Sequence, residues 1–113
     1  MCSGCHQPTG VGQAGLAPPL ADSEWVQGPD HRLARIVLHG LAGPVAVSGV
    51  RYNLEMPSLA TLSDDDIAHA LTYIRREWEN TADPVSPDTV RKTRSETSSR
   101  TQAWTADELH KIR

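Results

Sequence analysis

Apolar residues recur at helical spacing in residues 31–39, where three of them fall at i, i+3 and i+4: Leu33, Ile36 and Val37. This period predicts an amphipathic helix. Asp30 precedes the segment and is a candidate N-cap, while Gly40 follows it and is expected to end the helix.

A second helical pattern follows Ser63, which is a candidate N-cap with Asp66 three residues later. Acidic residues lie at its beginning and Arg75 and Arg76 near its end, as the helix dipole favours. Its apolar residues form one stripe at i, i+4, i+7 and i+11: Ile67, Leu71, Ile74 and Trp78. We expect this stripe to pack against another surface of the protein.

The segments outside these two helices have weaker patterns. Residues 7–30 are rich in Gly and Pro and are expected to form loop. Residues 43–49 alternate apolar and small residues over too short a length to separate a loop from one arm of a hairpin.

The composition changes after residue 82. Residues 83–85 are expected to be a linker, and Ser86 with Pro87 favours the start of another helix. Residues 91–102 contain only polar or charged side chains, so a helix there is expected to be weakly held. A capping box from Thr105 to Glu108 predicts a last helix, preceded by Trp104 as a candidate hydrophobic staple.

The chain has 113 residues, of which 38% are hydrophobic and 4% aromatic, and it contains no Phe. This length fits one small domain and excludes a two-domain enzyme. So few large apolar side chains make a thin core, which a buried cofactor would complete. The net charge of −3 gives no basic surface for nucleic acid, and no apolar stretch approaches the ~20 residues of a membrane span.

Cys2, Cys5 and His6 form the C-x-x-C-H pattern of covalent haem attachment. Two thiols at this spacing add to the two vinyl groups of one porphyrin, and the adjacent imidazole binds the iron. A dithiol redox pair is one alternative, but it needs a strand before the motif and a helix after it. A zinc site is another, and it needs a second pair of ligands at suitable spacing.

A six-coordinate haem needs a second axial ligand opposite His6. Met56 is the preferred candidate, because Pro57 stiffens the loop that presents it. Thioether ligation favours reduced iron and raises the reduction potential. Four histidines are the other candidates, each with an ordinary surface or helix-end interpretation: His31, His39, His69 and His110. For Met56 the alternative role is that of a core filler.

With these two motifs, residues 2 to about 80 resemble class I c-type cytochrome domains. A finer similarity is to monohaem domains that accompany bacterial periplasmic dehydrogenases and copper nitrite reductases. The segments that carry it follow the attachment motif and end in the second helix: residues 10–12, 16–20, 23–26, 36–41, 52–53 and 73–78.

The resemblance implies an all-α fold, a small helical domain in residues 1–80 wrapped around one covalently attached haem c, with residues 81–113 as a helical extension packing on it or trailing from it. It implies a carbonyl at Pro18 or Pro19 that accepts a hydrogen bond from the His6 ring. It also places the haem propionates near Trp25, Tyr52 and either Arg51 or Arg35.

The family carries a helix before the attachment motif that packs on the stripe of the later helix. Only Met1 precedes Cys2, so we expect that first helix to be missing from this chain, which is then a piece of a longer exported protein. Two alternatives account for the exposed face that results. Either the upstream segment was removed, or the segment after residue 82 covers part of this face, a hypothesis motivated by Trp104, Leu109 and Ile112.

The resemblance implies an electron carrier rather than an enzyme, free-standing or part of a larger oxidoreductase. It would pass single electrons between a periplasmic redox enzyme and an acceptor; the expected partners are a dehydrogenase, a reductase or an oxidase. Two other functions stay open. One is an open-site haem domain that binds small ligands or catalyses redox chemistry. The other is a haem-free thiol-disulfide oxidoreductase using Cys2 and Cys5.

Overall fold

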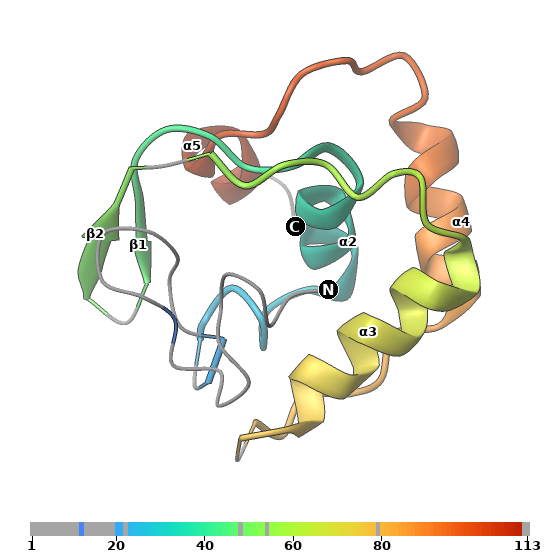
Figure 1. The fold of residues 1–113 in the computed structure, drawn as a ribbon, viewed down its shortest axis with the longest axis horizontal. Coiled ribbons are helices and arrows are strands. Elements are labelled where there is room, and N and C mark those ends of the chain that lie inside the picture. The colour runs from blue at the N-terminus through green and yellow to red at the C-terminus, as the bar shows by residue number, and fades with distance from the viewer. Residues whose placement is uncertain are drawn as a thin grey trace.

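A computed structural model describes residues 12, 20–21, 23–47, 49–53, 55–78 and 80–111 of the chain. The described part is mostly helical, with one two-stranded antiparallel sheet (Figure 1). In chain order the elements are α2 (Asp30–His39), β1 (Val45–Val47), β2 (Val50–Tyr52), α3 (Asp64–Arg76), α4 (Pro87–Glu96) and α5 (Ala106–His110). None of the helices in these residues is long and apolar enough to cross a membrane.

The helical class is confirmed, and the open alternative at residues 43–49 resolves as a hairpin arm. Val45 pairs with Tyr52 and Val47 with Val50. Val45 and Val47 are buried and Ala46 between them is exposed, so one face of β1 turns inward. The two-residue period was present in the sequence, but only packing shows which face is buried.

One core cluster, here called the helical cluster, joins the inner faces of α2 and α3. Its buried members are Val26, Leu33, Ala34, Val37, Leu38, Ile67, Ala68, Leu71, Ile74, Val85 and Val90. Helix α4 packs on both α2 and α3, at the right of Figure 1. Val85 and Val90 thereby reach the apolar stripe of α3, which the sequence left without a partner.

The expectation that the polar segment after residue 90 is weakly held is wrong, because two of its threonines are buried. Thr93 is 1% exposed and Thr97, just after the helix, is 7% exposed. Their hydroxyls donate to the carbonyls of Thr89 and Thr93, each four residues earlier and 2.8 Å away. Because these bonds satisfy the polar atoms locally, the threonine methyl groups can pack in the interior.

A second core cluster, here called the tryptophan cluster, lies around the hairpin and α5. Its buried members are Trp25, Ile36, Val45, Val47, Trp104, Ala106 and Leu109. Trp104 and Leu109 both belong to this cluster, which is consistent with the expected hydrophobic staple. The segment after residue 82 does cover part of the α3 stripe, but it does so through Val85 and Val90. Trp104 and Leu109, the residues expected there, pack in the tryptophan cluster instead. Ile112 lies outside the described residues.

Three helices are capped at their N-termini by the residues that the sequence predicts. The Ser63 hydroxyl accepts from the Asp66 amide, and the Ser86 hydroxyl accepts from the Thr89 amide, each at 3.1 Å. The capping box between Thr105 and Glu108 is complete. These caps were predictable because they involve residues three apart in the chain.

Two helix boundaries differ from the sequence interpretation. Asp30 lies inside the first turn of α2, behind Pro29, instead of capping it. Trp78 lies beyond the end of α3 and has a positive φ of 51°, so the helical stripe stops at Ile74. The side-chain Nδ2 of Asn80 donates to the Ile74 carbonyl at 2.7 Å, which satisfies a carbonyl that a longer helix would have used.

Candidate cofactor site

An apolar cavity lies between the two core clusters. Leu71 and Ile74 of α3 and the buried side of α2 form one wall, and β1 with Leu41 and Met56 forms another. Among the described lining residues only Ser23 carries a hydroxyl, and that oxygen already accepts from the amides of Trp25 and Val26. The full lining is Leu20, Ser23, Trp25, Val26, Leu33, Ile36, Val37, Leu41, Val45, Val47, Met56, Leu71 and Ile74. Such a surface suits a flat apolar cofactor.

Met56 is half-buried and is held by its backbone. Its amide donates to the Leu41 carbonyl at 2.7 Å, and its carbonyl accepts from the Leu41 amide at 3.1 Å. This pair of bonds forms an isolated antiparallel bridge between the segment after α2 and the Met56 loop. The backbone that carries the Met56 thioether is therefore held in place by its hydrogen bonds to Leu41.

The residues after Met56 are bound to the end of α2. The Ser58 hydroxyl donates to the Leu38 carbonyl at 2.6 Å, and the Leu59 amide donates to the Val37 carbonyl at 2.8 Å. Gly40 ends α2 at a φ of +84°, and a Cβ there would run into the Met56 carbonyl. Glycine is thus required both for the left-handed backbone and for the close approach of the Met56 loop.

Of three residues expected near the haem propionates, Trp25 lines the cavity, whereas Tyr52 and Arg51 do not. The Trp25 ring lines the cavity, and its indole nitrogen donates to the Ala46 carbonyl at 2.9 Å. Tyr52 is half-buried against the tryptophan cluster. Arg51 is exposed on β2 and lines a separate surface cleft that also includes Asp107 and His110.

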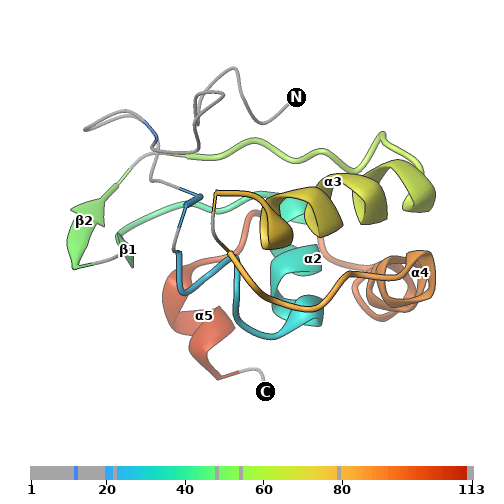
Figure 2. The same cartoon turned by 90° about the horizontal axis from the view of Figure 1, so that it is seen from below.

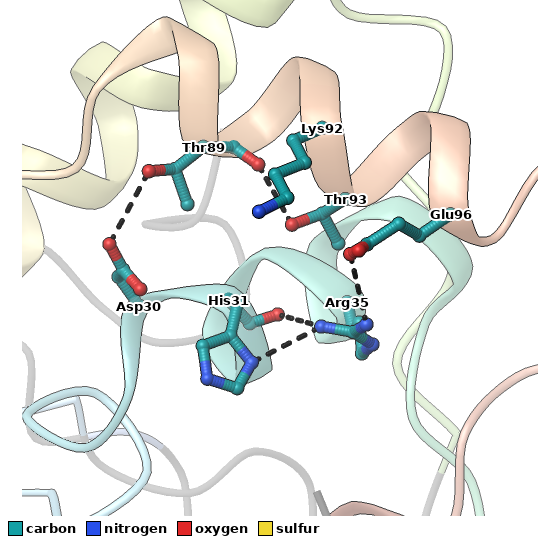
Figure 3. Close-up of a pocket in the computed structure, with 7 residues that line it drawn as sticks. All are labelled: Asp30, His31, Arg35, Thr89, Lys92, Thr93 and Glu96. Carbon is teal, nitrogen blue, oxygen red and sulfur yellow. Dashed lines mark hydrogen bonds and ion pairs between the residues drawn. The ribbon is translucent and has the colours of Figure 1, made fainter. Parts of the chain in front are cut away.

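Arg35, the other arginine considered for the propionates, faces α4. Its guanidinium donates to the His31 carbonyl at 3.1 Å and forms an ion pair with Glu96 at 3.5 Å (Figure 3). Arg35 lines a polar groove between α2 and α4, along with Asp30, Lys92 and others. The geometry therefore assigns Arg35 to helix packing.

The attachment residues fall outside the described part of the chain. These are Cys2, Cys5 and His6, and the two prolines expected to provide a carbonyl for His6, Pro18 and Pro19, also lie outside it. Leu20, the next residue in sequence, lines the cavity, and its carbonyl accepts from the side-chain Nδ2 of Asn80 at 3.0 Å. The chain that follows Pro19 thus enters the described structure at the cavity.

Met56 is the one candidate axial ligand among the described residues that lines the cavity. His69 and His110 are exposed, and His31 is bound to Arg35. His39 lies with its ring edge-on to Trp104, at 6.4 Å between centroids. Burial lowers the pKa of His39; a hydrogen bond with the Arg100 backbone partly opposes this shift, and the charges of Arg100 and Arg94 add to it. In the described ranges no group of three or more His, Cys, Asp or Glu could hold a metal ion.

Sequence reasoning missed the part of the cavity wall that forms outside the helices. Val45 and Val47 face the cavity, and their alternation with Ala46 was the only local signal. It also missed Arg75, which is 6% exposed and donates to the Val26, Gly28 and Asp83 carbonyls. Arg75 thereby joins the loop before α2 to the segment after α3, a contact that no sequence spacing indicates.

Comparison with known proteins gives one matching family model and two similar relatives. The model described as "Cytochrome C oxidase, cbb3-type, subunit III" matches residues 1–74. Cytochrome c-552 of Thermus thermophilus is 41% identical over 81 residues, covering 68% of this chain and 62% of the relative. A second cytochrome c-552 of the same species is also 41% identical over 81 residues, covering 68% of this chain and 55% of the relative. The chain therefore spans less than two thirds of the length of either relative.

Proposed function

This chain belongs to the family of c-type cytochrome domains, and on that premise we propose that it passes single electrons between a periplasmic redox enzyme and an acceptor. Domains of this family bind covalently attached haem c and transfer electrons. The haem supplies the one-electron oxidation and reduction, and the protein sets its environment. The finer elements of the proposal are the ligands, the partner and the compartment.

We propose that Cys2 and Cys5 hold the haem by thioether bonds and that His6 and Met56 are its axial ligands. The spacing of the first three residues supports their assignment. The single observation that carries the proposal is that Met56 lines an apolar cavity on a loop bound to both Leu41 and the end of α2. The apolar wall and the thioether donor both fit haem.

The residues around the cavity would act in two ways. The apolar side chains exclude water, and low polarity together with a thioether ligand favours the reduced state. The bonds from Met56 to Leu41 and from Ser58 to Leu38 hold the ligand loop in place. A fixed ligand geometry suits an electron carrier, because little rearrangement then accompanies the change of oxidation state.

The partner is proposed from the family alone: a dehydrogenase, a reductase or an oxidase that meets the protein in the periplasm. A small, weak interface suits rapid exchange of partners. We also propose that residues 1–80 form the haem domain and residues 81–113 an extension of it. Support for a close association comes from Val85 and Val90 in the helical cluster and Trp104 and Leu109 in the tryptophan cluster.

The test is the absorption spectrum of the oxidised and reduced protein, produced in a host that attaches haem to C-x-x-C-H motifs. We expect a low-spin haem in the wild type and a high-spin haem in Met56→Ala. The matched control is Glu55→Ala, because Glu55 is the exposed neighbour of Met56 and lines no part of the cavity. This variant should keep the wild-type spectrum.

Two results would overturn the proposal. A high-spin wild type whose spectrum is unchanged in Met56→Ala would favour an open-site haem domain that binds small ligands. A folded protein that carries no haem and reduces disulfides would return Cys2 and Cys5 to thiol chemistry.

A further inference from the structure

Three backbone segments lie side by side next to the cavity, and Leu41 is in the middle one. On one side Leu41 is bridged to Met56. On the other side the Ala42 amide donates to the Trp104 carbonyl at 2.8 Å, and the Trp104 amide donates to the Gly40 carbonyl at 3.0 Å. The segment before α5 is thus connected to the Met56 loop through one intervening strand of chain.

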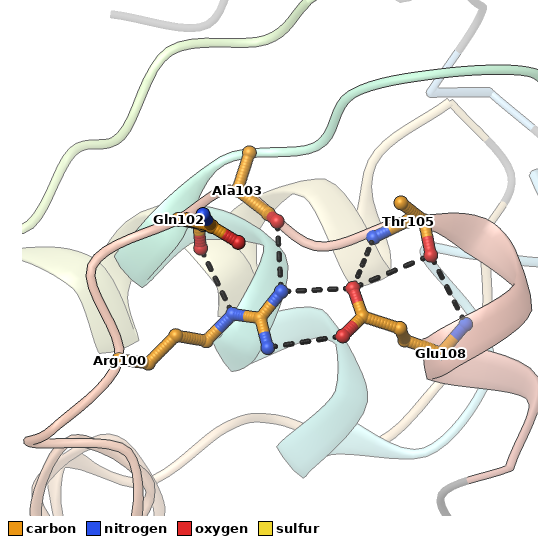
Figure 4. A network of polar contacts seen from close by, with 5 residues as sticks. All are labelled: Arg100, Gln102, Ala103, Thr105 and Glu108. Carbon is orange, nitrogen blue, oxygen red and sulfur yellow. Dashed lines mark hydrogen bonds and ion pairs between the residues drawn. The ribbon is translucent and has the colours of Figure 1, made fainter.

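Trp104 is itself fixed from several directions. Its ring is buried in the tryptophan cluster, at 9% exposure. The Arg100 guanidinium lies over that ring, 3.6 Å from its centroid. Arg100 also donates to the Gln102 and Ala103 carbonyls, each at 2.8 Å (Figure 4).

Glu108 completes the arrangement. Its carboxylate binds Arg100 through both oxygens, at 2.8 and 3.1 Å, and accepts from the Thr105 amide at 3.0 Å. A bidentate arginine-carboxylate pair combined with a capping box gives a geometry more rigid than an isolated surface ion pair. Residues 100–109, here called the C-terminal brace, therefore form a locally ordered unit behind Leu41.

We propose that the C-terminal brace positions Met56, with Trp104 as the main positioning residue. This inference rests on the proposed function, in which Met56 binds the haem iron. Leu41 cannot move away from Met56 without breaking its neighbours' bonds to Trp104, so the brace restricts the Met56 loop to one backbone position. A restricted loop presents the thioether at a higher effective concentration, which strengthens ligation without any contact between Trp104 and the ligand.

The test compares Trp104→Ala with Trp104→Phe. The indole nitrogen of Trp104 is buried and has no hydrogen-bond partner among the described residues, so phenylalanine keeps most of the packing and loses no bond. Imidazole is titrated into each oxidised holoprotein as a competitor for the Met56 position. We expect roughly tenfold tighter apparent imidazole binding in Trp104→Ala than in the wild type, and a near wild-type value in Trp104→Phe.

A second readout is amide hydrogen exchange at Met56, whose N–H is bonded to Leu41. Exchange at this amide should accelerate in Trp104→Ala and stay slow in Trp104→Phe. The control is Val90→Ala, which removes buried volume from the helical cluster. It should lower thermal stability while leaving imidazole affinity and Met56 exchange unchanged.

The two proposals fail in different ways. If wild-type spectra lack thioether ligation, the proposed function fails, and exchange at Met56 still reports whether the brace holds the loop. If thioether ligation is present and Trp104→Ala changes neither imidazole affinity nor Met56 exchange, the positioning role is overturned. Equal effects of Val90→Ala would also overturn it, because they would reflect general destabilisation. Where Trp104→Ala does not accumulate as folded protein, Arg100→Gln carries the same test with a smaller expected shift.

Discussion

The two core clusters of this protein are built on different principles. The helical cluster comes mainly from α2 and α3, whose apolar residues recur at helical spacing, and α4 adds Val90 to it. Helix α4 packs beside α2 and α3 in both views (Figures 1 and 2). The tryptophan cluster is assembled from a hairpin of three-residue strands, a five-residue helix and connecting segments. Short elements supply little local stability. Backbone hydrogen bonds between segments, such as those joining Leu41 and Met56, therefore contribute more to the stability of the tryptophan cluster.

The candidate site lies where these clusters meet. Leu71 and Ile74 line the cavity from the helical side, while Val45, Val47 and Met56 line it from the other. Helix α2 contributes to both, with Val37 in one cluster and Ile36 in the other. The helical side thus provides a regular wall, and the irregular side provides the candidate ligand. Four predictions test this division.

The largest effect is expected from ending the chain at residue 82. This removes Val85 and Val90 from the helical cluster and Trp104 and Leu109 from the tryptophan cluster. Burial of each such side chain contributes ~1.5–3 kcal/mol, and a domain's whole net stability is about 5–15 kcal/mol. Thermal unfolding of the holoprotein should lose its cooperative transition. A shortened protein that unfolds like the full chain would show that the extension belongs to neither core.

Leu71→Ala tests the helical wall alone. Leu71 is 1% exposed, and it packs in the helical cluster and lines the cavity. Its truncation should lower the free energy of unfolding by about 2–5 kcal/mol, measured by urea unfolding. His69→Ala, at an exposed position of the same helix, should change it by less than about 0.5 kcal/mol. Equal effects of the two changes would contradict the described packing of α3.

A pair of glycine changes tests the irregular side. Gly40 and Gly43 both have a positive φ, +84° and +81°, but a Cβ at Gly43 meets nothing within 4 Å, whereas one at Gly40 meets the Met56 carbonyl. Gly43→Ala should cost about 1–2 kcal/mol for the left-handed backbone. Gly40→Ala should cost a further ~1–3 kcal/mol for the collision. Urea unfolding measures both, and the Met56 contact is contradicted if the costs are the same.

The smallest effect concerns pH and His39, which lies beside Trp104 at the tryptophan cluster. Burial lowers the pKa of His39 in the folded protein, and its Nδ1 is buried without a partner in the described structure. The unfolded chain then binds the proton more tightly, with a usual pKa of about 6.5. Stability should therefore be constant above that pH and fall as the pH drops through it. His39→Gln should flatten this dependence. The measurement is the melting temperature from pH 8 to pH 5, about 1.5 units on either side of that pKa. An unchanged profile in the variant would contradict the assignment of this pH dependence to His39.

The sequence predicted those parts of the fold that depend on neighbours along the chain. The caps at Ser63 and Ser86 and the box from Thr105 to Glu108 are all contacts between residues three apart. The predictions that failed depend on contacts that the helical spacing and the capping patterns do not contain. Trp78 was assigned to α3, but the helix ends at Arg76 and the Asn80 side chain binds the Ile74 carbonyl. The α4 segment was expected to be weakly held because threonine counts as a polar residue in the sequence. In the structure its buried threonines bond their hydroxyls locally and pack their methyl groups in the interior.

The predictions for the site residues also divide into those consistent with the structure and those corrected by it. Met56 was selected from its chemistry and the neighbouring Pro57, and the structure places it on the cavity wall. Arg51 and Arg35 were associated with the haem by resemblance, and the structure places one on an exposed strand and the other against Glu96. The orientation of a long charged side chain depends on which partner the fold brings near, and sequence position does not contain that information.

By itself the sequence determined the family, the attachment motif and the starts of α3, α4 and α5, because thiol spacing and caps are local chemistry. The tertiary structure alone decided that Val85 and Val90 cover the α3 stripe and that Trp104 pairs with the segment holding Met56. These contacts join residues far apart in the chain. Their formation depends on the closure of long loops and on the shape of the surfaces that meet, and neither is encoded in a local pattern of residues.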